Sequence, residues 1–172
     1  AIHKITHPFF LMVLRKWPGY TNDMELVVDV REMSFQRTRM DRYKTLAWMK
    51  NCLEHRLSDN SDDVLLFDQD QIILEASRSN VFFIKGSTLI SPISNLILNG
   101  VTRNFVCKHA QDFGYELQER QVFLDEIPFF DEVFLTNSLR GIALVKSLGE
   151  FSITSGVKTA QLQRDFVDLL AT

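Results

Sequence analysis

The sequence predicts a single α+β domain with a hairpin-rich, largely antiparallel sheet or barrel-like core and flanking helices. Three observations support this class. Short apolar runs alternate with turn residues, three longer segments place apolar residues at helical spacing, and no repeat, low-complexity segment or linker divides the 172 residues. A chain of this length can bury a substantial core, and 45% hydrophobic residues, including 14 Phe, supply the material for it.

Strands are expected where an apolar run meets a turn signal. The runs at 8–14 and 24–30 give the first two strands, separated by the turn signal Pro18-Gly19. Two hairpins are expected next, 64–67 with 72–74 and 81–84 with 88–90, because polar or glycine-containing turns separate their strands. Further strands are expected at 132–136 and 142–146.

Helices are expected at 45–57, 102–113 and 158–170, because apolar residues recur there every three or four positions. We expect Gly114 to stop the second helix. In the third helix, the residues expected to face inward are Leu162, Phe166, Leu169 and Leu170.

Charge and cysteine content exclude several functions. A net charge of -3 argues against a nucleic-acid or anionic-membrane partner, and no apolar run approaches the ~20 residues that span a bilayer. The two cysteines, Cys52 and Cys107, lie in expected helices and favour a reduced, cytoplasmic setting. With His55 and His109 they could supply zinc ligands, but without a glycine knuckle the pattern is weak, and we expect no metal site.

Three features could together carry chemistry. Lys44 stands at the head of an expected helix, and the apolar residues after it can draw its amine toward the interior, where an amine is a better nucleophile. Glu75 ends an apolar strand beside the small and polar corner at 77–80. Gly100 and Thr102 open a helix whose free N–H groups and hydroxyl suit a phosphate.

An amine, a carboxylate and a glycine-led helix start are what a protein needs to hold pyridoxal 5'-phosphate. The amine forms an imine with the cofactor, the carboxylate pairs with the ring nitrogen, and the helix start binds the phosphate. Each feature alone has an ordinary interpretation: a surface lysine, a carboxylate just outside the sheet, or a helix capped by Thr102.

The order of these residues is more specific. The pattern Glu75-x-Ser77-x-x-Asn80-Val-Phe, followed by Leu98-x-Gly100-Val-x-Arg, resembles the signature of class IV aminotransferases. These fold-type IV pyridoxal phosphate enzymes include branched-chain aminotransferase, D-amino acid aminotransferase and 4-amino-4-deoxychorismate lyase. The segments at 43–46, 113–120 and 131–138 resemble further blocks of the family, so the likeness runs from Pro8 to the C-terminus.

The resemblance implies a role for each matching residue. Lys44 would form the imine and move protons at the substrate, Glu75 would pair with the pyridinium nitrogen, and Leu98 would pack against the ring. The residues implied to bind the phosphate are Val101, Thr102, Asn137 and Ser138. It also implies the fold of the large domain of D-amino acid aminotransferase-like enzymes, a small-molecule amino substrate and a homodimer.

The chain departs from the family pattern in three places. Ser91 replaces a preferred threonine, and Ala47-Trp48 replaces the commoner Asn-Tyr, which puts a contact to the ring hydroxyl in doubt. The family's small N-terminal domain has no counterpart, so residues 1–172 correspond to the large domain alone. We expect the chain to be an excerpt of a longer protein rather than a shortened relative.

Three functions are compatible with these features. Thr136-Asn137-Ser138 and the lack of a glycine-rich stretch after the lysine favour 4-amino-4-deoxychorismate lyase, which releases pyruvate and 4-aminobenzoate for folate synthesis. The alternative is an aminotransferase acting on a branched-chain or D-amino acid. A truncated, non-catalytic homologue that binds or dimerises is disfavoured by the intact set of Lys44, Glu75 and Thr102.

Overall fold

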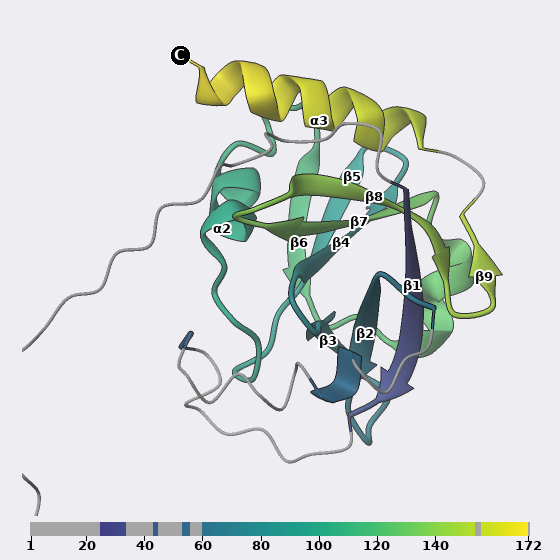
Figure 1. The fold of residues 1–172 in the computed structure, drawn as a ribbon. Coiled ribbons are helices and arrows are strands. Elements are labelled where there is room, and N and C mark those ends of the chain that lie inside the picture. Colours follow the sequence, from purple (N-terminus) through teal and green to yellow (C-terminus); the bar gives the residue numbers. More distant parts are fainter. Residues whose placement is uncertain (1–24, 34–42, 45–52, 56–59, 154–155, 172) are drawn as a thin grey trace, which may run out of the picture.

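A computed structural model describes residues 25–33, 43–44, 53–55, 60–153 and 156–171. In these residues a nine-stranded mixed sheet curls on itself, with two α-helices against one of its faces (Figure 1). The strands are β1 (Glu25–Glu32), β2 (Asp63–Phe67), β3 (Ile73–Ala76), β4 (Asn80–Lys85), β5 (Thr88–Pro92), β6 (Glu116–Arg120), β7 (Glu132–Asn137), β8 (Gly141–Leu148) and β9 (Phe151–Ser152). The helices are α2 (Val101–Lys108), the 3₁₀ helix η2 (Leu124–Phe129) and α3 (Val157–Leu170). None of the described helices is long and apolar enough to cross a membrane.

The strand order is β3-β2-β1-β8-β7-β4-β5-β6, and β9 pairs with β8. The hairpins β2–β3, β4–β5 and β7–β8 are antiparallel, as is the β4–β7 pair. β1 runs parallel to both of its neighbours, and β5 runs parallel to β6. The predicted hairpin-rich α+β fold is therefore confirmed, in the form of a mixed sheet.

The turns of the two predicted hairpins have local causes. In the first, Asp68 Oδ1 accepts hydrogen bonds from the N–H groups of Asp70 (3.1 Å) and Ile72 (2.9 Å), and this folds the chain back on itself. In the second, Gly86 adopts φ +58°, a left-handed conformation that favours glycine. Its N–H donates to Asp131 Oδ2 at 2.8 Å, so the turn is tied to the start of β7.

Two apolar layers lie on opposite faces of the sheet, and β4 contributes to both. Val81 and Phe83 belong to the layer closed by η2, whereas Phe82 and Ile84 belong to the layer closed by α2 and α3. Successive residues of a strand point to opposite faces, so a strand covered on both sides reads as a continuous apolar run. β7 is covered in the same way, with Val133 and Leu135 in the first layer and Phe134 in the second, so β4 and β7 lie at the centre of the packed sheet.

The predicted helices at 102–113 and 158–170 are both present, with differences in extent and burial. α2 ends at Lys108 rather than at 113, because the N–H of Ala110 bonds to Cys107 and the chain then turns through Gly114 (φ +81°) into β6. In α3, Leu162 and Phe166 are buried as predicted. Leu170, in contrast, is 46% exposed at the end of the helix.

Three elements were not predicted from the sequence. β6 has the polar sequence ELQER and presents no apolar run, η2 contains a proline, and β9 has only two residues. The buried Gln163 was also missed; its Nε2 donates to the carbonyl of Ile142 at 3.1 Å, which compensates its burial. The predicted strand at 8–14 and most of the predicted helix at 45–57 lie outside the described residues, and Leu53, Glu54 and His55 are helical.

The stacked pair Phe82 and Phe134 offers a test of the two-layer core. Their ring centroids are 5.0 Å apart, and neither side chain is exposed. We expect Phe82→Ala to lower the free energy of unfolding by about 3–5 kcal/mol, measured by urea denaturation, because it leaves a cavity in a strand covered on both faces. Phe129→Ala, at a ring that is 67% exposed, is the matched control and should cost less than about 1 kcal/mol.

Candidate functional site

One cavity of about 420 Å³ gathers the site residues predicted from the sequence. It lies between the β3–β4 corner, the start of α2 and the β7–β8 turn. The predicted residues in its wall are Lys44, Glu75, Leu98, Val101, Thr102, Asn137 and Ser138. The wall also contains residues that were not named as site residues: Tyr43, Arg78, Ser79, Asn80, Asn99, Gly100 and Thr136.

Glu75 provides a buried carboxylate at this cavity. Its side chain comes from β3, and the residue is only 2% exposed. Its Oε2 accepts one hydrogen bond from Asn80 Nδ2 (3.1 Å) and one from the Leu98 N–H (3.0 Å). In the tight corner after β3, the Ala76 N–H donates to the backbone carbonyl of Ser79 (2.8 Å). This corner brings Asn80 back beside the carboxylate. Burial and two donors fix the position of the acid.

Asn80 connects the acid to the segment that leads into α2. Its Nδ2 donates to the Leu98 carbonyl at 2.9 Å as well as to Glu75. One side-chain amide therefore holds two walls of the cavity together. The sequence contained the signal for this role, because Asn80 is part of the family motif, but its contacts could not be inferred from the motif.

The N-terminus of α2 opens into the same cavity. Gly100 is its N-cap residue and makes no side-chain cap hydrogen bond, and the first turn contains no acidic residue. Its first backbone N–H groups are therefore not occupied by a side-chain cap, and the positive end of the helix dipole faces the cavity. Thr102, considered above as a possible cap, lies inside the first turn and is 8% exposed. The same turn leaves Val101 78% exposed.

The β7–β8 turn forms the third wall. Asn137 Oδ1 accepts hydrogen bonds from the N–H groups of Leu139 (3.0 Å) and Arg140 (2.8 Å), and this shapes the turn around Ser138. Asn137 Nδ2 donates to Ser79 Oγ at 3.0 Å, which ties the turn to the β3–β4 corner. Close by, the buried Thr136 Oγ1 has no hydrogen-bond partner in the structure.

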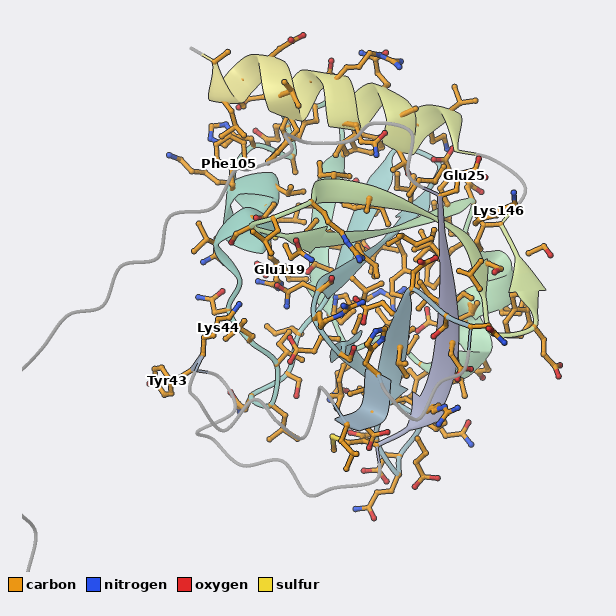
Figure 2. All side chains as sticks on the ribbon, viewed as in Figure 1. Glu25, Tyr43, Lys44, Phe105, Glu119 and Lys146 are labelled. Carbon is orange, nitrogen blue, oxygen red and sulfur yellow. The ribbon has the colours of Figure 1, made fainter. Side chains whose placement is uncertain are left out.

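Lys44 also lines the cavity, and it lies in the sequence before the strands and the helix that form the three walls. Figure 2 shows Tyr43 and Lys44 next to each other on one side of the molecule, far from the Glu25–Lys146 ion pair. Tyr43 is 65% exposed, and its ring projects outward in this view. Lys44 and Arg78 give the lining two basic side chains against the single carboxylate of Glu75. Ala47 and Trp48, which bear on the ring-hydroxyl contact, lie outside the described residues.

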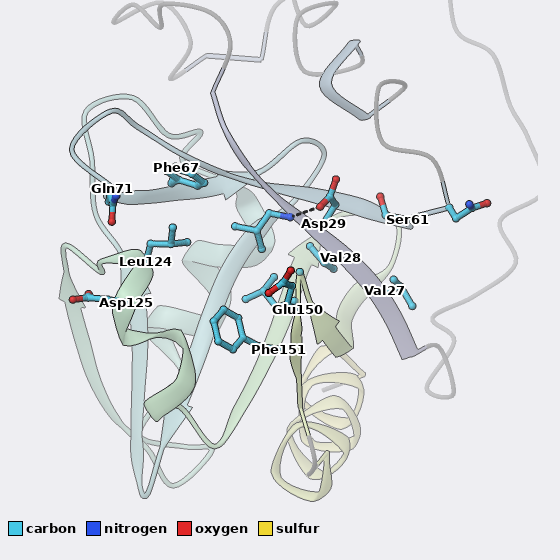
Figure 3. Close-up of a pocket in the computed structure, with 14 residues that line it drawn as sticks. Val27, Val28, Asp29, Ser61, Phe67, Gln71, Leu124, Asp125, Glu150 and Phe151 are labelled. Carbon is cyan, nitrogen blue, oxygen red and sulfur yellow. Dashed lines mark hydrogen bonds between the residues drawn. The ribbon is translucent and has the colours of Figure 1, made fainter.

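A larger hollow of about 780 Å³ lies between β1, the β8–β9 turn and η2 (Figure 3). Its charged lining residues, within the part of the chain that the structure describes, are Asp29, Asp125 and Glu150. Asp29 Oδ1 already accepts from the Val30 N–H at 2.8 Å, and its Oδ2 pairs with Arg31 at 2.7 Å. Without a basic group among these lining residues, this hollow does not suit an anion.

The described residues considered as zinc ligands show no arrangement for a metal. His109 pairs with Asp112 at 2.7 Å and packs its ring against Phe105. Burial raises the pKa of the Cys107 thiol and so disfavours the thiolate that binds a metal. In the described ranges, no group of three or more His, Cys, Asp or Glu side chains could hold a metal ion. Cys52 lies outside these ranges.

The similarity to known proteins covers most of the chain, not only the residues of the cavity. A branched-chain-amino-acid aminotransferase of Pseudomonas aeruginosa is 26% identical over 167 residues, which cover 90% of this chain and 54% of the relative. The branched-chain amino acid aminotransferase of Thermobaculum terrenum, solved in its PLP-bound holo form, has a TM-score of 0.74 at 25% identity and covers 86% of this chain and 52% of that chain. A putative 4-amino-4-deoxychorismate lyase of Legionella pneumophila has a TM-score of 0.70 at 26% identity, over 85% of this chain and 58% of that chain.

The chain therefore spans about half the length of these three proteins. The family model described as Amino-transferase class IV matches residues 6–148, most of the 172-residue chain. The curled mixed sheet agrees with the solved structures in fold. On the family match over most of its length, this chain belongs to the class IV aminotransferases.

Proposed function

We propose that the chain is the cofactor-binding domain of a pyridoxal 5'-phosphate-dependent enzyme. One observation carries the proposal: an amine (Lys44), a buried carboxylate (Glu75) and a helix N-terminus without a side-chain cap line the same cavity. These are the groups that a pyridoxal phosphate site requires, and they come from three separate parts of the sequence. A non-catalytic binding module would need no such combination.

The shape and chemistry of the cavity fit this cofactor. At the start of α2, a Cβ on Gly100 would collide with Asn80 Oδ1, so only glycine fits there and the backbone stays open to a ligand. The unpartnered hydroxyl of Thr136 and the basic side chains of Lys44 and Arg78 suit an anionic, hydrogen-bonding group. The single carboxylate is buried and held by two donors, as a partner for a ring N–H should be.

Each residue has a distinct task in this proposal. When bound, pyridoxal phosphate serves as an electron sink for the bond broken at the substrate Cα. The Lys44 amine would hold the cofactor covalently and then carry the proton at Cα, while Glu75 would keep the proton on the ring nitrogen. Leu98 would pack on the ring face, and the N–H groups of Val101 and Thr102 with the Asn137–Ser138 turn would bind the phosphate.

Two reactions are candidates for the whole enzyme. The Pseudomonas aeruginosa relative and its 90% coverage of this chain support transamination of a branched-chain amino acid. The lyase reaction on 4-amino-4-deoxychorismate is supported by the Legionella pneumophila structure at 26% identity and by the segment Thr136-Asn137-Ser138. We give transamination first place because its support covers more of the sequence. A small-molecule amino substrate and a cytoplasmic homodimer remain parts of the proposal.

Lys44→Ala tests the covalent attachment. We expect the variant to lose the visible absorbance band of the bound cofactor and to lose turnover, because no other lysine lines the described cavity wall. Lys146→Ala removes an exposed lysine paired with Glu25 at 3.0 Å and is the matched control; its spectrum should not change. A Lys44→Ala protein that retains the band would exclude this lysine as the attachment point.

Glu75→Gln tests the carboxylate. Asn80 and the Leu98 N–H both donate to Oε2 of Glu75, and the amide oxygen of a glutamine can accept from both donors at this position. The variant should therefore fold and bind the cofactor. We expect proton abstraction at Cα to slow by about a hundredfold or more, measured by single-turnover absorbance, because the ring becomes a weaker electron sink. Full activity in Glu75→Gln would remove this residue from the mechanism.

A substrate comparison separates the two reactions. The full-length protein is supplied with branched-chain amino acids plus 2-oxoglutarate and, separately, with 4-amino-4-deoxychorismate. We expect turnover in the first assay, detected as glutamate. Turnover only in the second assay, detected as pyruvate, would assign the lyase reaction instead.

A further inference from the structure

A second buried carboxylate, Asp63, lies behind the cavity wall. Asp63 is 0% exposed, although it carries an ionisable group at the start of β2. Its Oδ1 accepts from Ser77 Oγ at 2.6 Å and from the Val64 N–H at 2.9 Å, and its Oδ2 accepts from Ser79 Oγ at 3.1 Å. A buried carboxylate needs such donors to offset its lost hydration.

The Ser79 hydroxyl continues this set of hydrogen bonds to the cavity. Asp63, as a carboxylate, can only accept, so the Ser79 hydroxyl must donate its proton to Asp63. The lone pairs of Ser79 Oγ are then directed to Asn137 Nδ2, which lies 3.0 Å away and donates to them. The charge of Asp63 therefore fixes the direction of both hydrogen bonds of Ser79 and, together with the Arg78 carbonyl that also accepts from Nδ2 (3.5 Å), supports this orientation of the Asn137 amide.

The orientation of that amide shapes the β7–β8 turn. With Nδ2 facing Ser79, the Oδ1 atom of Asn137 faces the N–H groups of Leu139 and Arg140 and accepts from both. A reversed amide would place its NH₂ group against these two donors. One of the contacts that hold the turn presenting Ser138 to the cavity thus leads back to a carboxylate two hydrogen bonds away.

We propose that Asp63 and Ser79 are positioning residues that hold the Asn137–Ser138 turn in the geometry that binds the cofactor's phosphate. The phosphate part rests on the function proposed above; the hydrogen-bonded path from Asp63 to the turn does not. Neither residue is one of the specified positions of the family motif. Asp63 is not one of the residues that line the cavity; it contacts the wall through Ser79, which bonds in turn to Asn137.

Ser77 is a matched control because it bonds to the same carboxylate on a different path. It is 0% exposed and donates to Asp63 Oδ1, but it does not line the cavity or contact Asn137 in the described structure. Ser77→Ala and Ser79→Ala each remove one hydroxyl from Asp63. Only Ser79→Ala breaks the path to the turn.

The test compares the affinity of the full-length variants for pyridoxal 5'-phosphate and for pyridoxal, which lacks the phosphate. We expect Ser79→Ala to raise the Kd for pyridoxal 5'-phosphate about tenfold and to leave the Kd for pyridoxal unchanged. Ser77→Ala should leave the ratio of the two Kd values unchanged. Asp63→Asn should resemble Ser79→Ala, because Ser77 and Ser79 bond to different oxygens of Asp63, and the Val64 N–H and Ser77 hold the remaining amide oxygen at the Oδ1 position, away from Ser79. If Asp63→Asn does not fold, Ser79→Ala decides the test, since it retains the carboxylate.

Hydrogen exchange of the Leu139 and Arg140 amides in the cofactor-free protein gives a readout that does not depend on the proposed function. Exchange should accelerate about tenfold in Ser79→Ala and remain unchanged in Ser77→Ala. Unchanged exchange in Ser79→Ala, an equal acceleration in Ser77→Ala, or faster exchange with an unchanged Kd ratio would each overturn the inference. Failure of the unmodified protein to bind pyridoxal 5'-phosphate would overturn the proposed function and the phosphate part of the inference, and exchange would still decide whether Ser79 holds the turn.

Discussion

The buried Glu75 carboxylate is the constraint on which the site depends. An acid that is 2% exposed needs donors, and it receives them from Asn80 on β4 and from the backbone of Leu98 before α2. Satisfying this one group brings a strand end, a corner and a helix start together. The same contacts leave the N-terminus of α2 facing the cavity.

The sheet supplies the rigidity that such a site requires. β4 and β7 are covered on both faces, and the three walls of the cavity begin or end on these strands or on their direct neighbours. The β3–β4 corner and the β7–β8 turn are adjacent because β4 pairs with β7, with Asn80 opposite Thr136. Polar groups that are far apart in sequence therefore meet at one end of a packed sheet.

Sequence reasoning predicted the hairpins and the residues that line the cavity because both depend on local patterns. Alternating apolar runs marked β2 to β5, and the motif around Glu75 and Gly100 marked the cavity. It missed β6, whose sequence ELQER has a single apolar residue, Leu117, and which pairs in parallel with the edge of β5. It also missed the hydrogen bond between Ser79 and Asp63, because two residues 16 positions apart in the sequence form no repeating pattern that would indicate their contact.

The contact between Gly100 and Asn80 restricts how this protein can change. A side chain at position 100 would collide with Asn80 Oδ1, and shortening residue 80 to relieve the collision would remove a donor from Glu75. Neither position can vary alone. A double substitution that enlarges residue 100 and shortens residue 80 removes the collision, but it leaves Glu75 without the hydrogen bond from Asn80. In a library that randomises both positions, tolerated combinations should be far fewer than two independent sites would allow.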